Sequence, residues 1–363
     1  YKRQVFDVQA QEPVVLKGMA EPVRTYIVEG AKTRAFRMDT RGVEGVETRM
    51  VGRDAELLTL QNTFRDAMED AETRVVTVVG EAGVGKSRLL YEFENWLELL
   101  PESVTYFKGR PTAEMQAIPY GAMRDMFATR FEIRESDSAA AVLRKFRAGM
   151  AGILEPERAD LAGHLLGFDL SASQAVQNLL GSPSFRSLAM AYLTHYLRAV
   201  AARPAVMMLE DAHWADDGSL DLLDHLVTAI PEARLLVVCL ARPELFERRP
   251  QWGEGRAAFS RLELKPLSRR SSRALVAEIL QRVEQVPDEL RDLVVEGAEG
   301  NPFYVEELIK MLVEDGVILR GKEEWQVALE RLADVRVPPT LTGVLQARLD
   351  SLPRDERTVL QRA

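Results

Sequence analysis

The sequence contains little that would assign it to a special class of protein. Among its 363 residues there is one cysteine, Cys239, so no disulfide can form within the chain. We expect Cys239 to be a small buried apolar residue in a reducing compartment. No apolar run reaches the ~18 residues of a membrane span, and the N-terminus does not have the pattern of a signal peptide. We therefore expect a cytoplasmic chain that does not enter a membrane.

An excess of basic residues is also lacking. The chain has 47 Lys and Arg against 56 Asp and Glu, a formal net charge of −9. Nucleic-acid binders usually carry a basic stripe, so we expect no nucleic-acid partner for this chain. The one basic cluster, Arg269, Arg270 and Arg273, is interpreted as the solvated first turn of a helix.

What the sequence does contain is a glycine-rich loop between a strand-like run and a helical pattern. Residues 80–87, GEAGVGKS, match G-x-x-x-x-G-K-[ST] in full. Glycines let successive N–H groups turn toward one point, and the following helix adds its own free N–H groups and positive dipole end. Lys86 can reach the β- and γ-phosphates of a nucleotide, and the Ser87 hydroxyl can hold Mg²⁺. The predicted nucleotide-binding residues of the loop are Gly80, Gly83, Val84, Gly85, Lys86, Ser87 and Arg88.

A second apolar run, 205–209, ends in two carboxylates, Glu210 and Asp211. Ligands of open parallel sheets bind at the carboxyl ends of the strands. One acid is expected to hold Mg²⁺ together with Ser87, and we assign this to Glu210; the other would orient or deprotonate the attacking water. The division of roles between the two acids stays open. Arg242, after the run 234–241, is a candidate contact of the γ-phosphate, so the predicted catalytic residues are Lys86, Glu210, Asp211 and Arg242.

The order of the patterns predicts the domain organisation. Strand-like runs alternate with helical patterns over 49–265, which predicts an α/β fold with a parallel sheet covered by helices, as in P-loop NTPases. Residues 266–335 are predicted to form a small all-α domain, with a possible hairpin at 317–329. Residues 1–30 read as short strands and 31–48 as a linker. The chain starts without Met and stops inside a predicted helix, so we expect it to be part of a longer protein.

Several stretches together resemble the STAND class of P-loop ATPases, in the branch fused to class III nucleotide cyclases and to large bacterial transcription regulators. The matching stretches occur in family order: MVGRDAEL (50–57), VVGEAGVGKSRLL (78–90), LEDAHWADDGSLDLL (209–223), LARPELF (240–246), LKPLS (264–268) and GNPFYVEEL (300–308). A departure is Glu210, because the class commonly has two aspartates there. His213, Trp214 and Asp216 form the HWAD part of the signature.

The resemblance implies further roles. Val51, Gly52 and Arg53 would contact adenine, and Asn301 and Pro302 would close over the base and ribose. Residues 336–363 resemble only the start of a winged-helix domain. Residues 9–29, QAQEPVVLKGMAEPVRTYIVE, resemble the last strands of a class III cyclase, with its LKG…EPV…Y pattern. Residues 1–30 are therefore expected to be the end of such a domain, which is too short a piece to make cyclic nucleotide.

We therefore expect a regulatory switch that binds ATP or ADP with Mg²⁺, hydrolyses ATP slowly and controls an attached cyclase. We expect sensor or effector segments further along the parent protein, and the protein could form homo-oligomers. A ring-forming AAA-like motor is the first competing hypothesis, for which a neighbouring subunit would supply an arginine; Arg110, Arg186 and Arg256 are candidates. An ATP-dependent transcriptional regulator is the second. A P-loop kinase ranks low, because the acidic pair favours water as the nucleophile.

Overall fold

The structure is a computed structural model, and the residues that it describes are 6–10, 26–31, 46, 48–321 and 324–332. The chain divides into two units, residues 1–39 and 40–363. In the first unit, strands β1 (Phe6–Ala10) and β2 (Tyr26–Ala31) pair antiparallel, in agreement with the predicted short strands. The predicted winged-helix start at 336–363 lies outside the described residues, as does most of the predicted linker.

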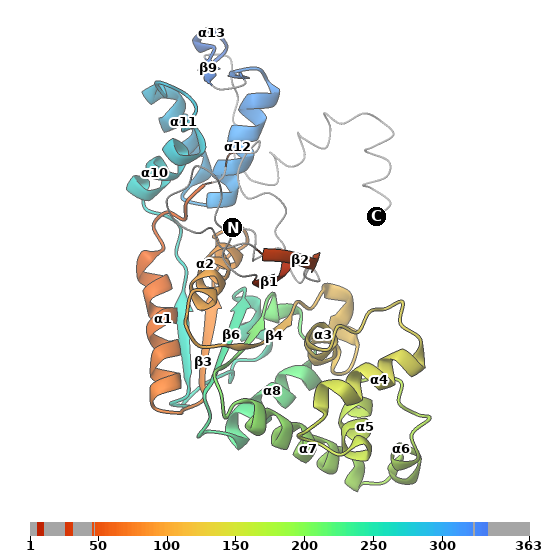
Figure 1. The fold of residues 1–363 in the computed structure, drawn as a ribbon. Coiled ribbons are helices and arrows are strands. Elements are labelled where there is room, and N and C mark those ends of the chain that lie inside the picture. Colours follow the sequence, from red (N-terminus) through yellow and green to blue (C-terminus); the bar gives the residue numbers. More distant parts are fainter. Residues whose placement is uncertain (1–5, 11–25, 32–45, 47, 322–323, 333–363) are drawn as a thin grey trace, which may run out of the picture. The chain divides into compact units, whose positions relative to one another are not determined.

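Five parallel strands form the central sheet of the second unit, in the order β4-β5-β6-β3-β7 (Figure 1). Their bounds are β3 Arg74–Val79, β4 Thr105–Gly109, β5 Ala205–Leu209, β6 Leu235–Ala241 and β7 Phe259–Glu263. The strand-like runs 74–80, 103–109, 205–209 and 234–241 of the sequence predict β3, β4, β5 and β6 correctly. They do not predict β7, because it is an edge strand whose Ser260, Arg261 and Glu263 are exposed, so it has no continuous apolar run.

Helices cover both faces of the sheet, as the sequence predicts. Val76 and Val78 of β3 pack with α1 (Asp54–Glu69) and α2 (Lys86–Glu98) on one face. Alternate residues of β5 and β6, such as Met207 and Cys239, belong to the core of the other face. Cys239 is completely buried, which confirms its predicted apolar role. The alternation follows from the two-residue period of a strand.

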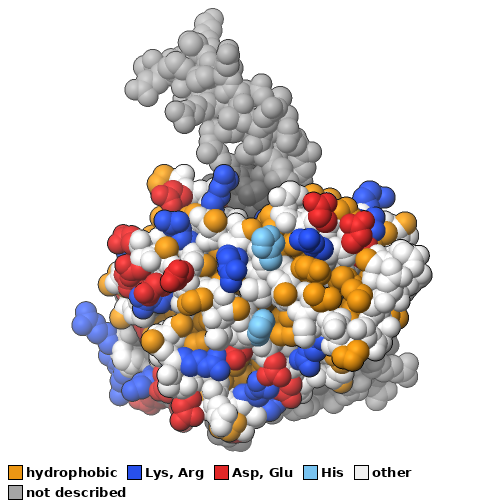
Figure 2. All heavy atoms as spheres, turned by 90° about the horizontal axis from the view of Figure 1, so that it is seen from below, with side chains coloured by type: hydrophobic (Ala, Val, Ile, Leu, Met, Phe, Trp, Pro, Cys, Tyr) orange, Lys and Arg blue, Asp and Glu red, His pale blue; other side chains and the backbone are white. Residues whose placement is uncertain are grey.

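The second face is covered mainly by helices that lie between β4 and β5 in the chain. They are η1 Ala113–Ala117, α3 Gly121–Arg130, α4 Ala139–Met150, α5 Pro156–Leu165, α6 Gln174–Leu179 and α7 Ser184–Val200. Phe127 and Tyr196 lie with their ring centroids 5.6 and 6.5 Å from that of Phe107 in β4, so these helices share one core with the sheet. The face drawn in Figure 2 shows basic and acidic side chains interspersed over the described residues, without a large area of one sign.

The remaining elements complete the α/β part and add a helical part. Following β5 come η2 (Ala212–Trp214), α8 (Asp217–Ala229) and, after β6, α9 (Glu244–Arg248). The helical part contains α10 Arg269–Ile279, α11 Asp288–Ala298, α12 Pro302–Glu314, β8 Ile318–Arg320, β9 Trp325–Val327 and α13 Leu329–Leu332. The predicted hairpin is present as the antiparallel pair of β8 and β9.

The helical part has its own core, which includes Val276, Leu290 and Leu308. Arg269 and Arg273 at its surface form ion pairs with Asp292, in agreement with a solvated helix turn. Within the described residues, no helix is long and apolar enough to cross a membrane.

Candidate nucleotide-binding site

The glycine-rich loop joins the end of β3 to the start of α2 with a backbone that only glycine adopts easily. Gly83 has φ +79° and Gly85, at the N-terminus of α2, has φ +102°. A Cβ on Gly80 would lie 2.7 Å from Val84 Cγ1 and 3.0 Å from the Leu264 carbonyl oxygen. The loop therefore closes tightly over the N-terminus of α2, where unpaired N–H groups and the helix dipole favour an anion.

Lys86 lies inside this loop. Its side chain is buried, and its Nζ donates to the carbonyl oxygens of Gly80 at 2.6 Å and Glu81 at 2.9 Å. Burial lowers the pKa of the ammonium, and the Arg242 guanidinium lowers it further. In the described part of the chain, no carboxylate lies within ion-pair distance of Lys86 Nζ. A buried cation held only by carbonyl groups fits a site for a phosphate group.

The acidic pair lies at the carboxyl end of β5, beside the loop. Burial raises the pKa of the Glu210 carboxyl, and the nearby Arg110 guanidinium and Ser87 hydroxyl oppose that rise. Asp211 has a left-handed backbone, φ +47°, and its Oδ2 lies 3.2 Å from Arg110 Nε. Ser87 and Glu210, the predicted metal ligands, are therefore together. The described residues contain no cluster of three or more His, Cys, Asp or Glu side chains suited to a metal, but Mg²⁺ usually needs only one or two protein ligands beside water and phosphate.

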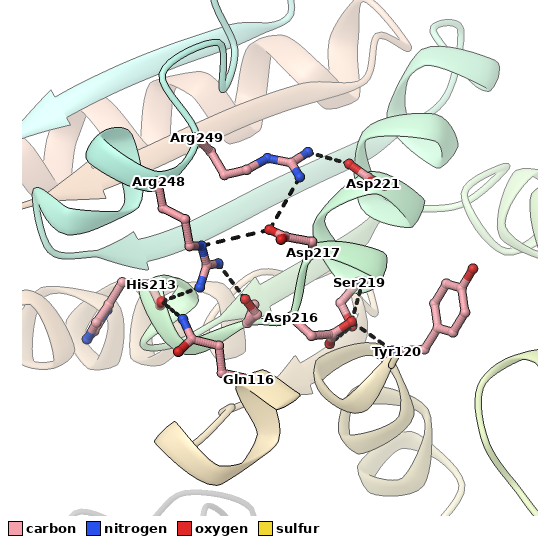
Figure 3. A network of polar contacts seen from close by, with 10 residues as sticks. Gln116, Tyr120, His213, Asp216, Asp217, Ser219, Asp221, Arg248 and Arg249 are labelled. Atoms are coloured by element: carbon pink, nitrogen blue, oxygen red, sulfur yellow. Dashed lines mark hydrogen bonds and ion pairs between the residues drawn. The ribbon is translucent and has the colours of Figure 1, made fainter. Parts of the chain in front are cut away.

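His213 lies close to the acidic pair, in η2. Its ring is buried, burial lowers its pKa, and neither ring nitrogen has a hydrogen-bond partner among the described residues. Its ring centroid lies 5.0 Å from that of Trp214. The carbonyl oxygen of His213 accepts hydrogen bonds from Arg248 Nη1 at 3.2 Å and Gln116 Nε2 at 3.4 Å (Figure 3). Two side chains from separate elements thus fix the backbone that follows Asp211.

Asp216, the last residue of the HWAD signature, has a structural position. Its buried carboxylate accepts hydrogen bonds from Ser219 N at 2.9 Å, from Tyr120 N at 2.7 Å and from Ser219 Oγ (Figure 3). It also accepts one from Ala122 N. It caps α8 and at the same time receives N–H groups from the start of α3. The signature therefore combines a site neighbour, His213, with a residue that joins two helices.

The segment 51–53 lies between the loop and the helical part. Val51 packs against the helical core, and a Cβ on Gly52 would lie 2.6 Å from Ser271 Oγ in α10. The buried Arg53 donates from Nη2 to the carbonyl oxygens of Val84 at 3.0 Å and Lys265 at 2.7 Å. Its guanidinium thus binds loop backbone, and its predicted contact with adenine stays a prediction.

Asn301 and Pro302 also lie against the loop. Asn301 Oδ1 accepts from the N–H groups of Phe303 and Tyr304 at the start of α12, and Asn301 Nδ2 donates to the Ala82 carbonyl oxygen at 3.0 Å. Pro302 occupies the first turn of α12 and lies 3.9 Å from where a Cβ on Gly85 would be. The predicted contact with base and ribose is untested by these positions.

Arg88 has a different position from the rest of the predicted loop residues. Its guanidinium binds the Glu92 carboxylate and the Thr48 carbonyl oxygen, so its side chain is engaged outside the loop. The predicted role of Arg88 in nucleotide binding stays a prediction.

The three candidate arginines of a ring-forming motor are spread over the chain. Arg110 lies beside Asp211 at the carboxyl edge of the sheet. Arg256 pairs with Asp224 and lies just before β7. Because the start of β7 aligns with the start of β3, Arg256 lies near the amino ends of the parallel strands, opposite to the end that carries the acidic pair. Arg186 lies in the first turn of α7.

The sequence patterns missed two backbone contacts of the site, the Phe303 N–H and the Lys265 carbonyl, and the side chain of Arg248. Backbone groups leave no signal in the residue type. Arg248 lies 35 residues from His213, and nothing in its local pattern links the two.

Comparison with known proteins gives two family matches and a relative. The AAA ATPase domain matches residues 49–238, more than half of the chain, and a domain of unknown function matches residues 268–319. An uncharacterized protein of Rhizobium meliloti (strain 1021) is 29% identical over 349 residues, which cover 93% of this chain and 31% of that protein. The chain thus spans about a third of the length of this relative.

Three solved structures are similar to this chain at low sequence identity. The Aeropyrum pernix ORC1 protein in complex with DNA has a TM-score of 0.47 and 14% identity, covering 88% of this chain and 73% of that one. The Drosophila ORC bound to DNA has a TM-score of 0.47 and 16% identity, covering 88% and 69%. A Thermotoga maritima RuvB variant has a TM-score of 0.39 and 14% identity, covering 86% and 75%.

Proposed function

Because the chain belongs to the AAA ATPase domain family, we propose that it binds ATP or ADP with Mg²⁺ and acts as a regulatory switch of the STAND type. In this proposal the bound nucleotide selects the arrangement of the α/β part and the helical part. Hydrolysis is slow, because a switch needs a long-lived state. The arrangement then controls an attached output, for which we propose a nucleotide cyclase.

The observation that carries the proposal is the contact between α12 and the glycine-rich loop. Asn301 Nδ2 and the Phe303 N–H donate to the Ala82 and Gly83 carbonyl oxygens. Arg53 adds a second connection, because it binds both the loop and Lys265, just before α10. A change of loop shape would therefore be transmitted directly to the helical part.

The residues of the site have complementary roles in this proposal. Lys86 and the loop N–H groups hold the phosphates, and Ser87 with Glu210 holds Mg²⁺. Bound Mg²⁺-ATP would supply the cleavable phosphoanhydride bond. Asp211 orients the attacking water, and Arg242 adds positive charge beside Lys86. Because Arg110 already binds one oxygen of the Asp211 carboxylate, fewer acceptor positions are left to orient the attacking water, which supports slow turnover.

The proposed cyclase output is argued from the N-terminal segment of the chain. It depends on the resemblance of residues 9–29 to the last strands of a class III cyclase. The strands β1 and β2 that the structure describes there are compatible with this origin. The relative's greater length leaves room for further domains in a homologous parent protein.

Steady-state turnover of Mg²⁺-ATP tests the proposal, with Lys86→Ala as the control. We expect near-zero turnover, on the order of a few per hour, and tight nucleotide binding that the variant loses. Turnover above about 1 s⁻¹, within the usual range of enzymes, would refute the switch. A turnover that rises steeply with protein concentration would instead favour a ring-forming motor in which a neighbouring subunit supplies an arginine.

A further inference from the structure

Three successive carbonyl groups of the glycine-rich loop accept hydrogen bonds from outside the loop. Asn301 Nδ2 binds the carbonyl oxygen of residue 82 at 3.0 Å, and the Phe303 N–H binds that of residue 83 at 3.2 Å. Arg53 Nη2 binds that of residue 84 at 3.0 Å. Of these three donors, only that of Asn301 is a side-chain group of the helical part. Asn301 lies more than 200 residues after Ala82 in the chain.

We propose that Asn301 is a positioning residue that holds the glycine-rich loop in its anion-binding shape, so that nucleotide affinity depends on its hydrogen bond to Ala82. This inference rests on the proposed nucleotide switch and names the side chain that couples its two parts. It assigns Asn301 to the loop backbone, a role separate from a contact with the nucleotide itself.

The geometry of the peptide group explains how this contact acts. In a planar trans peptide the C=O and N–H groups point in opposite directions. Holding the Ala82 carbonyl toward Asn301 therefore directs the Gly83 N–H away from α12. A Cβ on Gly83 would lie 2.6 Å from Asn301 Oδ1 and 2.9 Å from Phe303 Cβ, so the helical part is in close contact with the loop at this residue. Loss of the bond would let the peptide between residues 82 and 83 rotate and would disorder one N–H donor of the site.

The two hydrogen-bonding functions of Asn301 can be separated by substitution. Its Oδ1 caps α12, at 3.1 Å from Phe303 N and 3.3 Å from Tyr304 N, whereas its Nδ2 serves the loop. Serine and aspartate are also good N-cap residues, but neither has an amide donor that can reach Ala82. Asn301→Ser and Asn301→Asp therefore keep the cap and remove only the loop contact.

The control for a general loss of helix stability is Ser138→Ala. Ser138 Oγ caps α4 by accepting from Ala141 N at 3.3 Å, and α4 is no part of the loop.

The experiment measures two quantities on the whole chain. Binding of a fluorescent N-methylanthraniloyl ADP with Mg²⁺ gives affinity and dissociation rate, and hydrogen exchange without nucleotide reports on the amides of residues 82–86. For both Asn301 variants we expect affinity to fall about three- to tenfold, as for one hydrogen bond, mainly through faster dissociation. Loop amides should exchange faster than in the wild type. Ser138→Ala should change neither quantity.

Other results would overturn the inference. If Asn301→Ser keeps wild-type affinity and exchange, Asn301 does not position the loop. If only Asn301→Asp weakens binding, the added negative charge is the cause, and the inference is again wrong. If the fluorescent ADP binds neither the wild type nor Lys86→Ala, the proposed function fails. In that case faster hydrogen exchange of the loop amides in both Asn301 variants would still support the positioning role of Asn301, and unchanged exchange would refute it.

Discussion

Replacing Asp216 would show whether this carboxylate holds two helix starts together or serves the nucleotide site. It is 3% exposed and accepts four hydrogen bonds of 2.5 to 3.3 Å, from Tyr120 N, Ala122 N, Ser219 N and Ser219 Oγ. Hydrogen bonds to a charged group contribute about 1.5–3 kcal/mol each, and they are not additive within one network. Because Asp216→Ala leaves all four buried donors without this acceptor, we expect the free energy of unfolding to fall by about 3–5 kcal/mol.

Asp216→Asn provides the matched comparison. Its remaining oxygen can still accept from Tyr120 N and Ser219 N, and its amide can donate to Ser219 Oγ, but the amide would face the Ala122 N–H. We therefore expect a smaller loss, about 1–2 kcal/mol.

Urea denaturation followed by circular dichroism gives both values by linear extrapolation. The ADP affinity of folded Asp216→Asn, measured in the cold, should stay within about twofold of the wild type. The reasoning is refuted if Asp216→Ala costs less than about 0.5 kcal/mol, or if Asp216→Asn keeps its stability but loses nucleotide binding.

Three further predictions concern the site itself. Burial lowers the pKa of His213 below its usual 6.5, so the unfolded chain takes up this proton first on acidification. The free energy of unfolding should fall as pH decreases from about 6.5 through the lowered pKa, by at most ~1.4 kcal/mol per pH unit. His213→Gln should reduce this pH dependence, and an equal slope in the variant and the wild type would contradict the prediction. Gly83→Ala and Gly85→Ala should each cost at least about 1–2 kcal/mol, because both residues have a positive φ. Gly83→Ala should weaken ADP binding more, since its Cβ would also lie 2.6 Å from Asn301 Oδ1, whereas that of Gly85 would meet only Pro302 at 3.9 Å. Thermal unfolding and ADP titration check this, and equal binding losses would argue against close packing of α12 on the loop. Arg110→Ala removes a half-exposed ion pair, so stability should change by less than about 1 kcal/mol while ATP turnover rises about two- to fivefold as Asp211 is released; a turnover below that of the wild type would refute this role.

The sequence predicted the sheet where local pattern and burial coincide. Residues 235–241 are apolar throughout, and 75–79 are apolar except for Thr77, because helices cover both faces of these strands. β7 does not follow this rule, since it has a neighbour on only one side among the described strands, and half-exposed strands tolerate polar residues. The helical part was predictable for a similar reason: α10, α11 and α12 each bury one stripe of apolar residues in a shared core.

For the site, the sequence by itself determined the chemistry, because a phosphate loop needs glycines, a lysine and a hydroxyl within eight consecutive residues. The resemblance to known ATPases added Asn301 and Arg53 as candidates, without their partners. Only the tertiary structure decided that both side chains bind loop carbonyl groups, that Arg110 holds Asp211, and that Asp216 joins two helices. These contacts span from 31 to more than 200 residues of chain, and their partners are largely backbone groups. Every residue has such groups, so no residue type marks them, and their meeting depends on how the chain packs.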